Sequence, residues 1–331
     1  MERAFLTVIA LTAAYLLDWI IGDPPGLPHP VRLLGTVIVF LEKAARRLFA
    51  SPRGLKIAGG AIVIIAAGGA FAIVFGLLAA AYSLHPAAGL ALEIYILFTA
   101  LAGGDLRNHV RTVEQNLKTG NLAEARTSTA LLVSRDTAGM GESSLSRAAL
   151  ESLFENSADG LVAPLFFAAL GGPAAAVLYK AVNTMDSMIG YKTKEYLNLG
   201  YFAAKIDDIL SFIPARLTAA IIILAGMLHK RRRKNWYDGW RVLRDDRRKH
   251  ESPNSAWPEA AAAGVLGLRF GGSDYYHGEL VYRPEINPSG REPGCGDIAK
   301  GLVLFRYTSI VAFTGLLLLA YCLRVWEAVP F

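Results

Sequence analysis

Three carboxylates four residues apart stand in the stretch ESLFENSADG, residues 151–160. They are Glu151, Glu155 and Asp159, and an α-helix would place all three on one face. Like charges at this spacing repel each other unless a cation, a proton or a basic partner lies against them. Asn156 adds an amide oxygen, and Mg²⁺ prefers a few such oxygens together with substrate phosphates. The stretch suggests a magnesium site at Glu155, Asn156 and Asp159; the alternative is an exposed helix whose acids are screened by solvent.

Two further stretches place charges of both signs beside apolar runs. In YKAVNTMDSM, the spacing of Lys180, Asn183 and Asp186 lets a helix present a cation, an amide and an acid on roughly one side. The stretch AAKIDDILSFIPAR repeats this mixture with Lys205, Asp207, Asp208 and Arg216. Such charges are costly against apolar surroundings unless they have partners. A site that binds phosphate through Lys and Arg, and metal through Asp and Asn, would supply those partners.

Several other charged residues in the first half of the chain allow both a structural and a functional interpretation. Asp18 lies in an apolar run, where an ionisable residue is a functional candidate, although a helix-end acid near the interface is the simpler reading. Asp23 lies in the turn GDPP, followed by His29, and turn chemistry alone explains Asp23 equally well. Arg135 in VSRDT could grip a phosphate or carboxylate through its guanidinium fork, or could form a weak loop salt bridge.

The stretch SPNSAWPEAAAAGVLGLRFGGSDYYHG, residues 252–278, predicts turns, then an Ala-rich helix, then an aromatic loop from Gly271 to Gly278. Glu259 stands in the first turn of the helix, where an acid also complements the helix dipole. The aromatic faces and polar edges of this region could receive a large planar ligand. The sequence contains no Walker-type phosphate loop, GxGxxG, HExxH or GxSxG motif, so a bound nucleotide would not use a Walker loop.

Composition indicates a membrane protein, because 53% of the 331 residues are hydrophobic and only 19% are charged. Apolar windows near the length needed to cross a bilayer occur at about 4–21, 57–82, 88–103, 160–182, 210–228 and 302–323. We therefore expect an all-α, polytopic integral membrane protein with four to six membrane segments and helical cytoplasmic loops. We expect residues 1–331 to form a single membrane-embedded domain.

The charge of +6 is spread between the apolar windows, and the positive-inside rule places 22–56, 104–159 and 229–301 in the cytoplasm. The first span then runs from outside to inside and the last from inside to outside. The two cysteines are too few for a disulfide framework and fit a reducing, cytoplasm-facing environment.

The windows 160–182 and 210–228 leave the topology open. If both cross, residues 183–209 lie outside, away from the other polar segments. Gly171-Gly172-Pro173 breaks the first window and Pro214 the second, so we favour re-entrant elements that line a protein cavity.

Taken together, the chain resembles the CbiB/CobD family of cobalamin biosynthesis. The resemblance covers nearly the whole chain and is carried, in order, by GDPPGLPHPVRLLG, VSRDT, ESLFENSADGLVAPLFFAALGGPAAAVLYKAVNTMDSMIGY, AAKIDDILSFIPARLTA and SPNSAWPEAAAAGVLGLRFGGSDYYHGEL. Small departures are Ser211, where we expect Asn, and Ala256 and Ala262, where we expect Gly and Met.

The resemblance implies a membrane enzyme of the acid–amine ligase type, an adenosylcobinamide-phosphate synthase. Such an enzyme joins aminopropanol or its phosphate to the free carboxylate of adenosylcobyric acid, with ATP and Mg²⁺ as cofactors. ATP would convert the carboxylate to an acyl phosphate, from which the amine displaces phosphate. The implied partners are the corrinoid, the amine and the lipid bilayer, with no nucleic acid. A homo-oligomer, or an assembly with other cobalamin-pathway enzymes, is left open. The implied location is the cytoplasmic membrane, multi-pass, with the active site facing the cytoplasm.

Within that reading, the residue roles rest on chemistry. We predict catalytic acids at Glu151, Glu155, Asp159, Asp186, Asp207 and Asp208. We predict substrate contacts at Asp23, His29, Arg135, Lys180, Asn183, Arg216, Asn254, Trp257, Glu259 and Tyr276.

Two other classes use the same charged stretches. In a transporter, Asp18, Asp186 and the Asp207-Asp208 pair would form a proton or cation relay, and broken helices suit that reading. Against it, the sequence has no visible internal repeat, and its long polar segments hold Trp, Tyr and Asn combinations that a permeation path does not need. An enzyme acting on lipid phosphates explains SPNSAWPEA less well.

Overall fold

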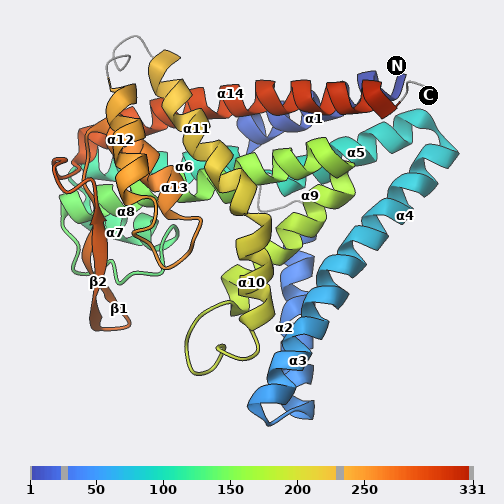
Figure 1. Cartoon of the computed structure of the whole chain (residues 1–331), viewed down its shortest axis with the longest axis horizontal. Coiled ribbons are helices and arrows are strands. Elements are labelled where there is room, and N and C mark those ends of the chain that lie inside the picture. The colour runs from blue at the N-terminus through green and yellow to red at the C-terminus, as the bar shows by residue number, and fades with distance from the viewer. Residues whose placement is uncertain (1, 24–28, 229–234, 328–331) are drawn as a thin grey trace. The chain divides into compact units, whose positions relative to one another are not determined.

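The computed structural model describes residues 2–23, 29–228 and 235–327, and these are mainly helical (Figure 1). The helices in the first half of the chain are α1 (Glu2–Ile21), α2 (Pro30–Leu48), α3 (Pro52–Val63), the π-helical segment η1 (Ile64–Gly68), α4 (Gly69–Leu84), α5 (Pro86–Ala100), α6 (Gly103–Lys118), α7 (Leu122–Ala130) and α8 (Glu142–Ser157). The remaining elements are the π-helical segment η2 (Ala158–Val162), α9 (Ala163–Ile189), α10 (Tyr201–Leu210), α11 (Phe212–Leu228), α12 (Trp236–Asp246), α13 (Ala256–Leu266), the strands β1 (Phe270–Tyr276) and β2 (Glu279–Ile286), and α14 (Cys295–Glu327).

Within the described residues, five helical segments are long and apolar enough to cross a membrane. They are Arg3–Ile21, Pro52–Leu84, Pro86–Lys118, Glu142–Ile189 and Cys295–Trp326. The pair α10 and α11, bent by 45°, makes a sixth if it is one span. The predicted all-α, multi-pass architecture with four to six membrane segments is therefore confirmed. The single domain over 1–331 stays a prediction.

Both predicted helix breaks are present. In α9, Gly171 and Gly172 have non-helical backbone angles, and Gly172 has φ of 71° and ψ of −165°, a region that glycine adopts far more readily than other residues. The bend between α10 and α11 lies at Ser211, three residues before Pro214. The re-entrant reading of these two windows stays a prediction.

The chain divides into two compact units. Unit 1 comprises Met1–Ala102, Ala163–Ser211 and Thr314–Phe331, and unit 2 comprises Gly103–Val162 and Phe212–Phe313. The continuous helical segment α8–η2–α9 and the long helix α14 each contribute residues to both units.

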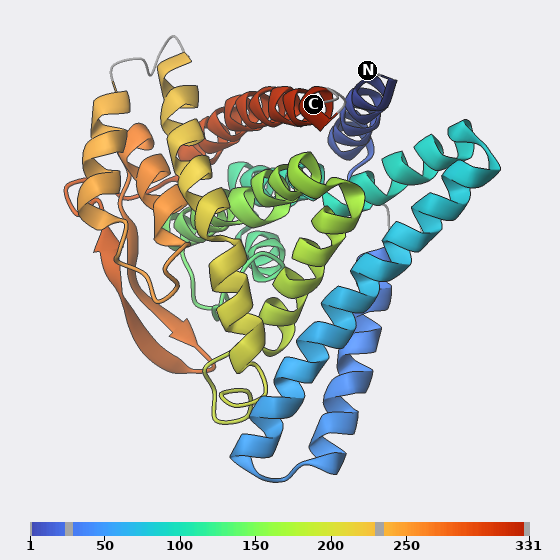
Figure 2. The same ribbon diagram turned by 45° about the vertical axis from the view of Figure 1, so that its right-hand side comes forward.

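In unit 1, the helices α2, α3, α9 and α10 pack around a shared apolar core (Figure 2). Ile38 of α2, Ile62 of α3 and Met185 of α9 are almost completely buried there. Gly59 lets α3 approach the chain before α10 very closely, since a Cβ atom at this position would lie 1.9 Å from the carbonyl oxygen of Leu199. A larger residue would force these segments apart.

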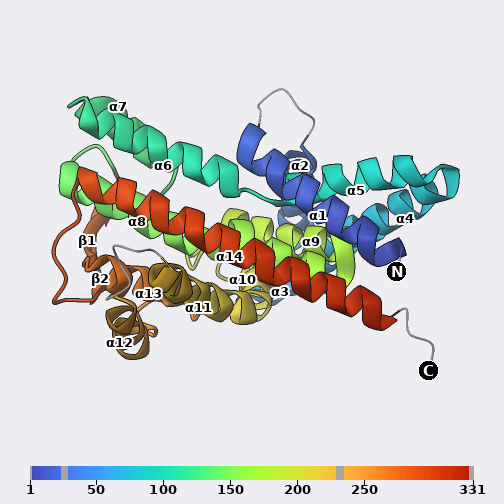
Figure 3. The same cartoon turned by 90° about the horizontal axis from the view of Figure 1, so that it is seen from above.

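In unit 2, the short helix α13 lies beside α11 and α12 (Figures 1 and 3). Most of its residues are buried, in keeping with its Ala-rich sequence. Gly264 makes the close packing possible, because a Cβ atom there would lie 2.5 Å from the carbonyl oxygen of Asp238 in α12. The predicted helix with Glu259 in its first turn is confirmed.

The predicted aromatic loop at residues 271–278 is wrong, because β1 and β2 form an antiparallel hairpin there. The turn uses His277 and Gly278, with φ values of 51° and 80°. A register shift between Phe270 and Gly272 accommodates the two glycines that favoured a loop. The strand alternation buries Asp274 and exposes Tyr275, so β1 delivers a carboxylate to the interior of unit 2.

Candidate functional site

A buried arginine ties together three segments of unit 2 that are distant in sequence. Arg135 lies in the loop between α7 and α8 and is 7% exposed. Its Nη2 donates to the carboxylate of Glu151 in α8, and its Nη1 donates to Asp274 of β1 at 3.0 Å. Its Nε donates to the Tyr276 hydroxyl at 3.1 Å. Burial opposes the charged form of Arg135, but the carboxylate of Glu151 outweighs it and raises the pKa of the guanidinium. The predicted cation at Arg135 is thus the centre of a charge network.

A second arginine completes the attachment of the hairpin to α8. Arg147 of α8 donates to Asp274 at 2.6 Å and to the carbonyl oxygen of Gly271. In return, the Gly271 backbone N–H donates to Glu151 Oε1 at 2.6 Å. These bonds give both buried carboxylates more than one partner, which is what makes ionised groups tolerable in an interior.

Arg283 of β2 connects this network to α13. Its Nη1 lies 3.8 Å from Glu151 Oε2, and its Nη2 lies 3.7 Å from Glu259 Oε1. Both distances exceed hydrogen-bonding range. Arg283 therefore compensates the charges of Glu151 and Glu259 without donating a hydrogen bond to either carboxylate. Burial alone would lower the pKa of Arg283, but Glu259 and Glu151 outweigh it and raise the pKa.

Glu259 is the least satisfied acid among the described residues of unit 2. It is completely buried, and neither of its carboxylate oxygens has a hydrogen-bond partner in the described part of the chain. Burial raises the pKa of Glu259 well above its usual range, against the opposing attraction of Arg283. A buried carboxyl group in this condition needs either a proton or a cation.

The carboxyl group of Glu259 has two neighbours that could share a cation with it. One potential ligand atom each from Glu155, His250 and Glu259 lies within 4.8 Å of the other two. Glu155 comes from α8 and Glu259 from α13, whereas His250 precedes α13 in the loop after α12. Glu155 and His250 are half-buried and Glu259 is buried, so the group is partly accessible to solvent.

The hydrogen bonding of His250 restricts its role. The Ser252 backbone N–H donates to His250 Nδ1 at 3.0 Å, so in the neutral ring the proton is on Nε2. Burial lowers the pKa of His250 and so favours the neutral ring. His250 therefore presents an N–H donor, and metal binding through Nε2 would need that proton removed.

The donor set fits Mg²⁺ when the two carboxylates are the ligands. Mg²⁺ takes one or two carboxylates and completes its shell with water and phosphate oxygens. Glu155 and Glu259 provide those carboxylates, and the unpartnered oxygens of Glu259 are the structural observation that calls for a cation.

Three of the predicted substrate-binding residues form a neighbouring cluster in unit 2. Arg216 of α11 donates to Asn254 Oδ1 at 3.0 Å. Its guanidinium lies 4.4 Å from the centre of the Trp257 ring, which makes a cation–π contact. A cationic and aromatic surface of this kind can receive a planar, anionic ligand.

In unit 1, α9 and α10 bring a second set of predicted residues together. Asn183 Nδ2 donates to Asp207 Oδ1 at 3.3 Å, and the Ser211 hydroxyl donates to Asp207 Oδ2 at 3.4 Å. Lys205 forms an ion pair of 3.8 Å with Asp208, and the carboxylates of Asp186 and Asp208 interact electrostatically. Lys180 lies on α9 with Asn183 and Asp186.

The other predicted residues of unit 1 lie around α1 and α2. Asp23 Oδ1 lies 3.7 Å from His29 Nε2 and 3.4 Å from Arg32 Nη2. Asp18 is buried in α1. The structure thus joins Asp23 and His29.

The predicted stack of three acids is divided among different environments. Glu151 belongs to the arginine network and Glu155 to the group with His250 and Glu259. Asn156 turns its amide nitrogen to the carbonyl oxygen of Ser152 at 2.9 Å. Asp159 lies in η2, where the wider π-helical turn interrupts the four-residue spacing. The metal ligands predicted at Asn156 and Asp159 stay predictions.

Sequence reasoning missed four residues of this site: Arg147, His250, Asp274 and Arg283. The local sequence could have pointed to Asp274, since it is an acid in the short stretch GGSDYY, between two glycines and two tyrosines. His250 and Arg283 lie in polar segments rich in charges, where nothing in the local sequence distinguishes them.

A family model described as CobD/Cbib protein matches residues 11–305 of this chain. The cobalamin biosynthesis protein CobD of Klebsiella pneumoniae is 41% identical over 310 residues, which cover 93% of this chain and 95% of that protein. The CobD protein of Citrobacter koseri is 42% identical over 326 residues, covering 98% of this chain and 100% of that protein.

The cobalamin biosynthesis protein CbiB of Salmonella typhimurium is 39% identical over 320 residues, with 96% of this chain and 98% of that protein covered. No solved structure matches this chain significantly.

Proposed function

This chain belongs to the CobD/Cbib family, and on that premise we propose that it acts in cobalamin biosynthesis as an ATP-dependent acid–amine ligase. It joins aminopropanol or aminopropanol phosphate to adenosylcobyric acid and forms adenosylcobinamide or its phosphate. The observation that carries the proposal is full-length similarity, at about 40% identity, to proteins named for cobalamin biosynthesis.

The chemistry of the reaction requires charge compensation more than a nucleophilic side chain. A carboxylate is a poor electrophile at neutral pH, and ATP with Mg²⁺ would activate it by phosphorylation. Phosphate is then released when the amine forms the amide bond. Negative charge concentrates on phosphoryl oxygens, so the protein must supply cations and N–H donors. Unit 2 has both in one place.

Glu155 and Glu259 would hold the magnesium ion. Their carboxylates approach each other from α8 and α13, and Glu259 makes no hydrogen bond to any described residue that a metal would have to displace. Arg283 is the arginine best suited to a phosphate, because both of its ion pairs are longer than hydrogen bonds. Arg135 and Arg147 are already held by Glu151 and Asp274, so they fix the position of the acids and of the hairpin.

His250 would act as a hydrogen-bond donor to the substrate or to a metal ligand. Its Nδ1 accepts the Ser252 N–H, so its Nε2–H can orient a carboxylate or a phosphate oxygen. This assigns His250 a positioning role beside the metal site.

The remaining predicted residues would serve the organic substrates. Arg216 and Trp257 offer a cationic, aromatic surface to the corrinoid and its free carboxylate. Asp186, Asp207 and Asp208 belong to unit 1, and their role as catalytic acids stays a prediction. We place the working face toward the cytoplasm, where ATP is available and where the basic loops are predicted to lie.

The direct test supplies the purified full-length protein in detergent with ATP, Mg²⁺ and adenosylcobyric acid. Aminopropanol is added in one reaction and aminopropanol phosphate in another. Ligation of the free amine removes one negative charge from the coloured corrinoid, whereas ligation of the phosphate replaces the carboxylate with a phosphate. Both products can be separated by ion exchange. A folded sample that forms neither product refutes the proposal.

Glu155→Gln tests the metal site within that assay. The amide keeps the shape of the side chain and removes the charge that a magnesium ion needs, so we expect turnover to fall by about a hundredfold, the upper end of the loss caused by removing a residue that supports a metal ligand. Glu124→Gln is the matched control, because Glu124 is an exposed acid on α7 of the same unit. Equal activity of both variants would remove Glu155 from the site.

A further inference from the structure

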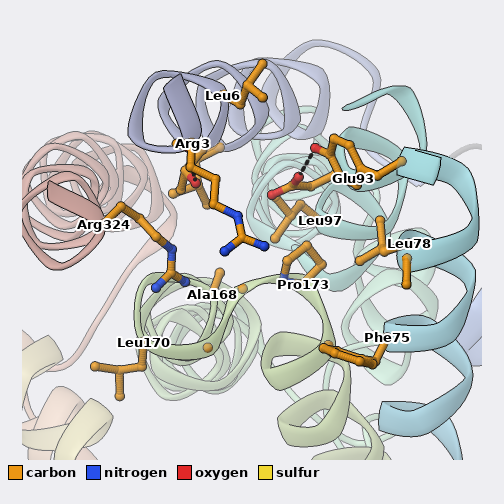
Figure 4. A pocket seen from close by; sticks show the side chains of 17 residues that line it. Arg3, Leu6, Phe75, Leu78, Glu93, Leu97, Ala168, Leu170, Pro173 and Arg324 are labelled. Atoms are coloured by element: carbon orange, nitrogen blue, oxygen red, sulfur yellow. Dashed lines mark hydrogen bonds between the residues drawn. The ribbon is translucent and has the colours of Figure 1, made fainter. Parts of the chain in front are cut away.

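Unit 1 contains a cavity that the proposed ligase reaction does not use. It has a volume of about 610 Å³ and lies among α1, α4, α5, α9 and α14 (Figure 4). Its size falls in the range of sites for small organic ligands, which is about 300–1,000 Å³. The walls are mainly apolar, with Leu6, Phe75 and Leu97 among them.

Two arginines from opposite ends of the chain converge on this cavity. Arg3 comes from the start of α1 and Arg324 from the last turns of α14, and Figure 4 shows both side chains extending into the same space. Arg3 is the first residue of the span Arg3–Ile21, and Arg324 lies near the end of the span Cys295–Trp326. Both guanidinium groups therefore lie where a membrane-spanning helix meets the headgroup region.

One acid shares the cavity with them. Glu93 of α5 accepts a hydrogen bond of 2.5 Å from the Tyr82 hydroxyl, and both arginines act electrostatically on its carboxyl group. With Glu93 ionised, two positive charges and one negative charge leave the lining with a single net positive charge. A ligand with one negative charge would complete the balance.

The broken helix α9 lines another part of the cavity. Gly171, Gly172 and Pro173 line the cavity, so the second half of α9 begins at its wall. Irregular backbone at membrane depth is tolerated where it lines a cavity, and the start of a helix favours a negative group.

We propose that this cavity binds an anionic phospholipid, with the phosphodiester between Arg3 and Arg324 and the acyl chains against the apolar wall. The single negative charge of a phosphatidylglycerol headgroup matches the net charge of the lining, and an apolar wall beside two arginines suits an amphiphile better than a free phosphate ion. Under the predicted topology, both arginines lie on the side opposite to the basic loops, so the lipid belongs to the outer leaflet. Arginines at span ends also contact headgroups individually, but two of them converging on one cavity with an acid provides a defined site.

Native mass spectrometry of the full-length protein in detergent tests the proposal. Phosphatidylglycerol, phosphatidylcholine and glycerol phosphate are titrated separately. We expect phosphatidylglycerol to bind more tightly than the other two. Arg3→Gln combined with Arg324→Gln should weaken its binding by about 25-fold, since each arginine near an anionic lipid contributes a factor of about five. Arg53→Gln, an exposed arginine at the start of α3 in the same unit, should leave binding unchanged.

Glu93→Gln should change the affinity for phosphatidylglycerol in the opposite direction, and this test does not require that the double arginine variant folds. It removes the negative charge from the lining, so phosphatidylglycerol should bind more tightly than to the native protein. Equal binding of phosphatidylglycerol and phosphatidylcholine would overturn the proposal, and so would unchanged or weaker binding to the Glu93→Gln variant. If glycerol phosphate binds as tightly as phosphatidylglycerol, the lipid proposal is overturned and the ligand is a soluble phosphate ester. None of these results depends on ligase activity.

Discussion

Replacement of Arg135 by Met is the most informative single perturbation of unit 2. Methionine preserves much of the length of the side chain but removes the guanidinium from a position that is 7% exposed. The change eliminates the donors to Glu151, to Asp274 at 3.0 Å and to the Tyr276 hydroxyl at 3.1 Å. Two buried carboxylates then lose a shared counter-charge.

The magnitude follows from the partners that remain. Removing one member of a buried ion pair costs about 3–5 kcal/mol. Glu151 keeps the Gly271 N–H at 2.6 Å and Arg283 at 3.8 Å, while Asp274 keeps Arg147 at 2.6 Å. Because both acids retain a partner, we expect the lower end, about 3 kcal/mol. For a unit of this size that corresponds to a decrease in Tm of about 6–12 °C.

Thermal unfolding in detergent, followed by circular dichroism, measures this decrease. Arg244→Met is the control, because Arg244 forms an exposed ion pair of 2.9 Å with Asp245, and its loss should leave Tm unchanged. The double variant Arg135→Met with Glu151→Gln removes both charges of one pair and should recover at least about 1 kcal/mol. A Tm for Arg135→Met equal to that of Arg244→Met would refute the description of a mutually dependent buried network.

Two further predictions concern the metal site and its support. Mg²⁺ at a hundred times its Kd should stabilise the native protein by about 2.7 kcal/mol in a thermal-shift assay. Glu155→Gln and Glu259→Gln should abolish that shift, whereas His250→Ala should reduce it without abolishing it. Complete loss of the shift in His250→Ala would instead indicate that His250 is itself a metal ligand. Gly264→Ala should destabilise the protein by about 1–3 kcal/mol in the same assay, because its Cβ atom would lie 2.5 Å from the Asp238 carbonyl oxygen and 2.7 Å from Gly239 Cα. Gly139→Ala is its control, because no described atom lies within 4 Å of a Cβ atom at that position, and equal stability of the two variants would contradict the close contact of α12 and α13.

The helical architecture could be predicted because it depends on local patterns. Long apolar windows identified the candidate spans, and Gly171-Gly172-Pro173 marked the break in α9. Glu259 could be placed in the first turn of a helix, because Pro and Ala at its side favour that element. Each of these features is determined by residues close together in sequence.

The composition of the site could not be predicted in the same way. His250 acquires its role through Glu155, which lies 95 residues earlier in the sequence, and Arg283 through Glu151, which lies 132 residues earlier. The sequence of the hairpin predicts a loop because Gly271 and Gly272 weaken the strand pattern, whereas the hairpin is stabilised by strand pairing and by Arg147. Asp159 would lie on the same face as Glu155 only if the α-helical period continued, and the π-helical turn at η2 interrupts that period.

The long sequence separations within the arginine network also bear on how the protein is made. Arg147 precedes its partner Asp274 by 127 residues, and Glu151 precedes the Gly271 N–H by 120 residues. At about 5–20 residues per second, a ribosome needs roughly 6–25 s to synthesise the intervening chain. During that interval the guanidinium of Arg147 lacks its ion-pair partner Asp274, and an unpaired charge is costly in a bilayer. We therefore expect the first half of α8 to stay exposed to water until the β1–β2 hairpin has left the ribosome. Unit 2 would then assemble after the early spans have been inserted.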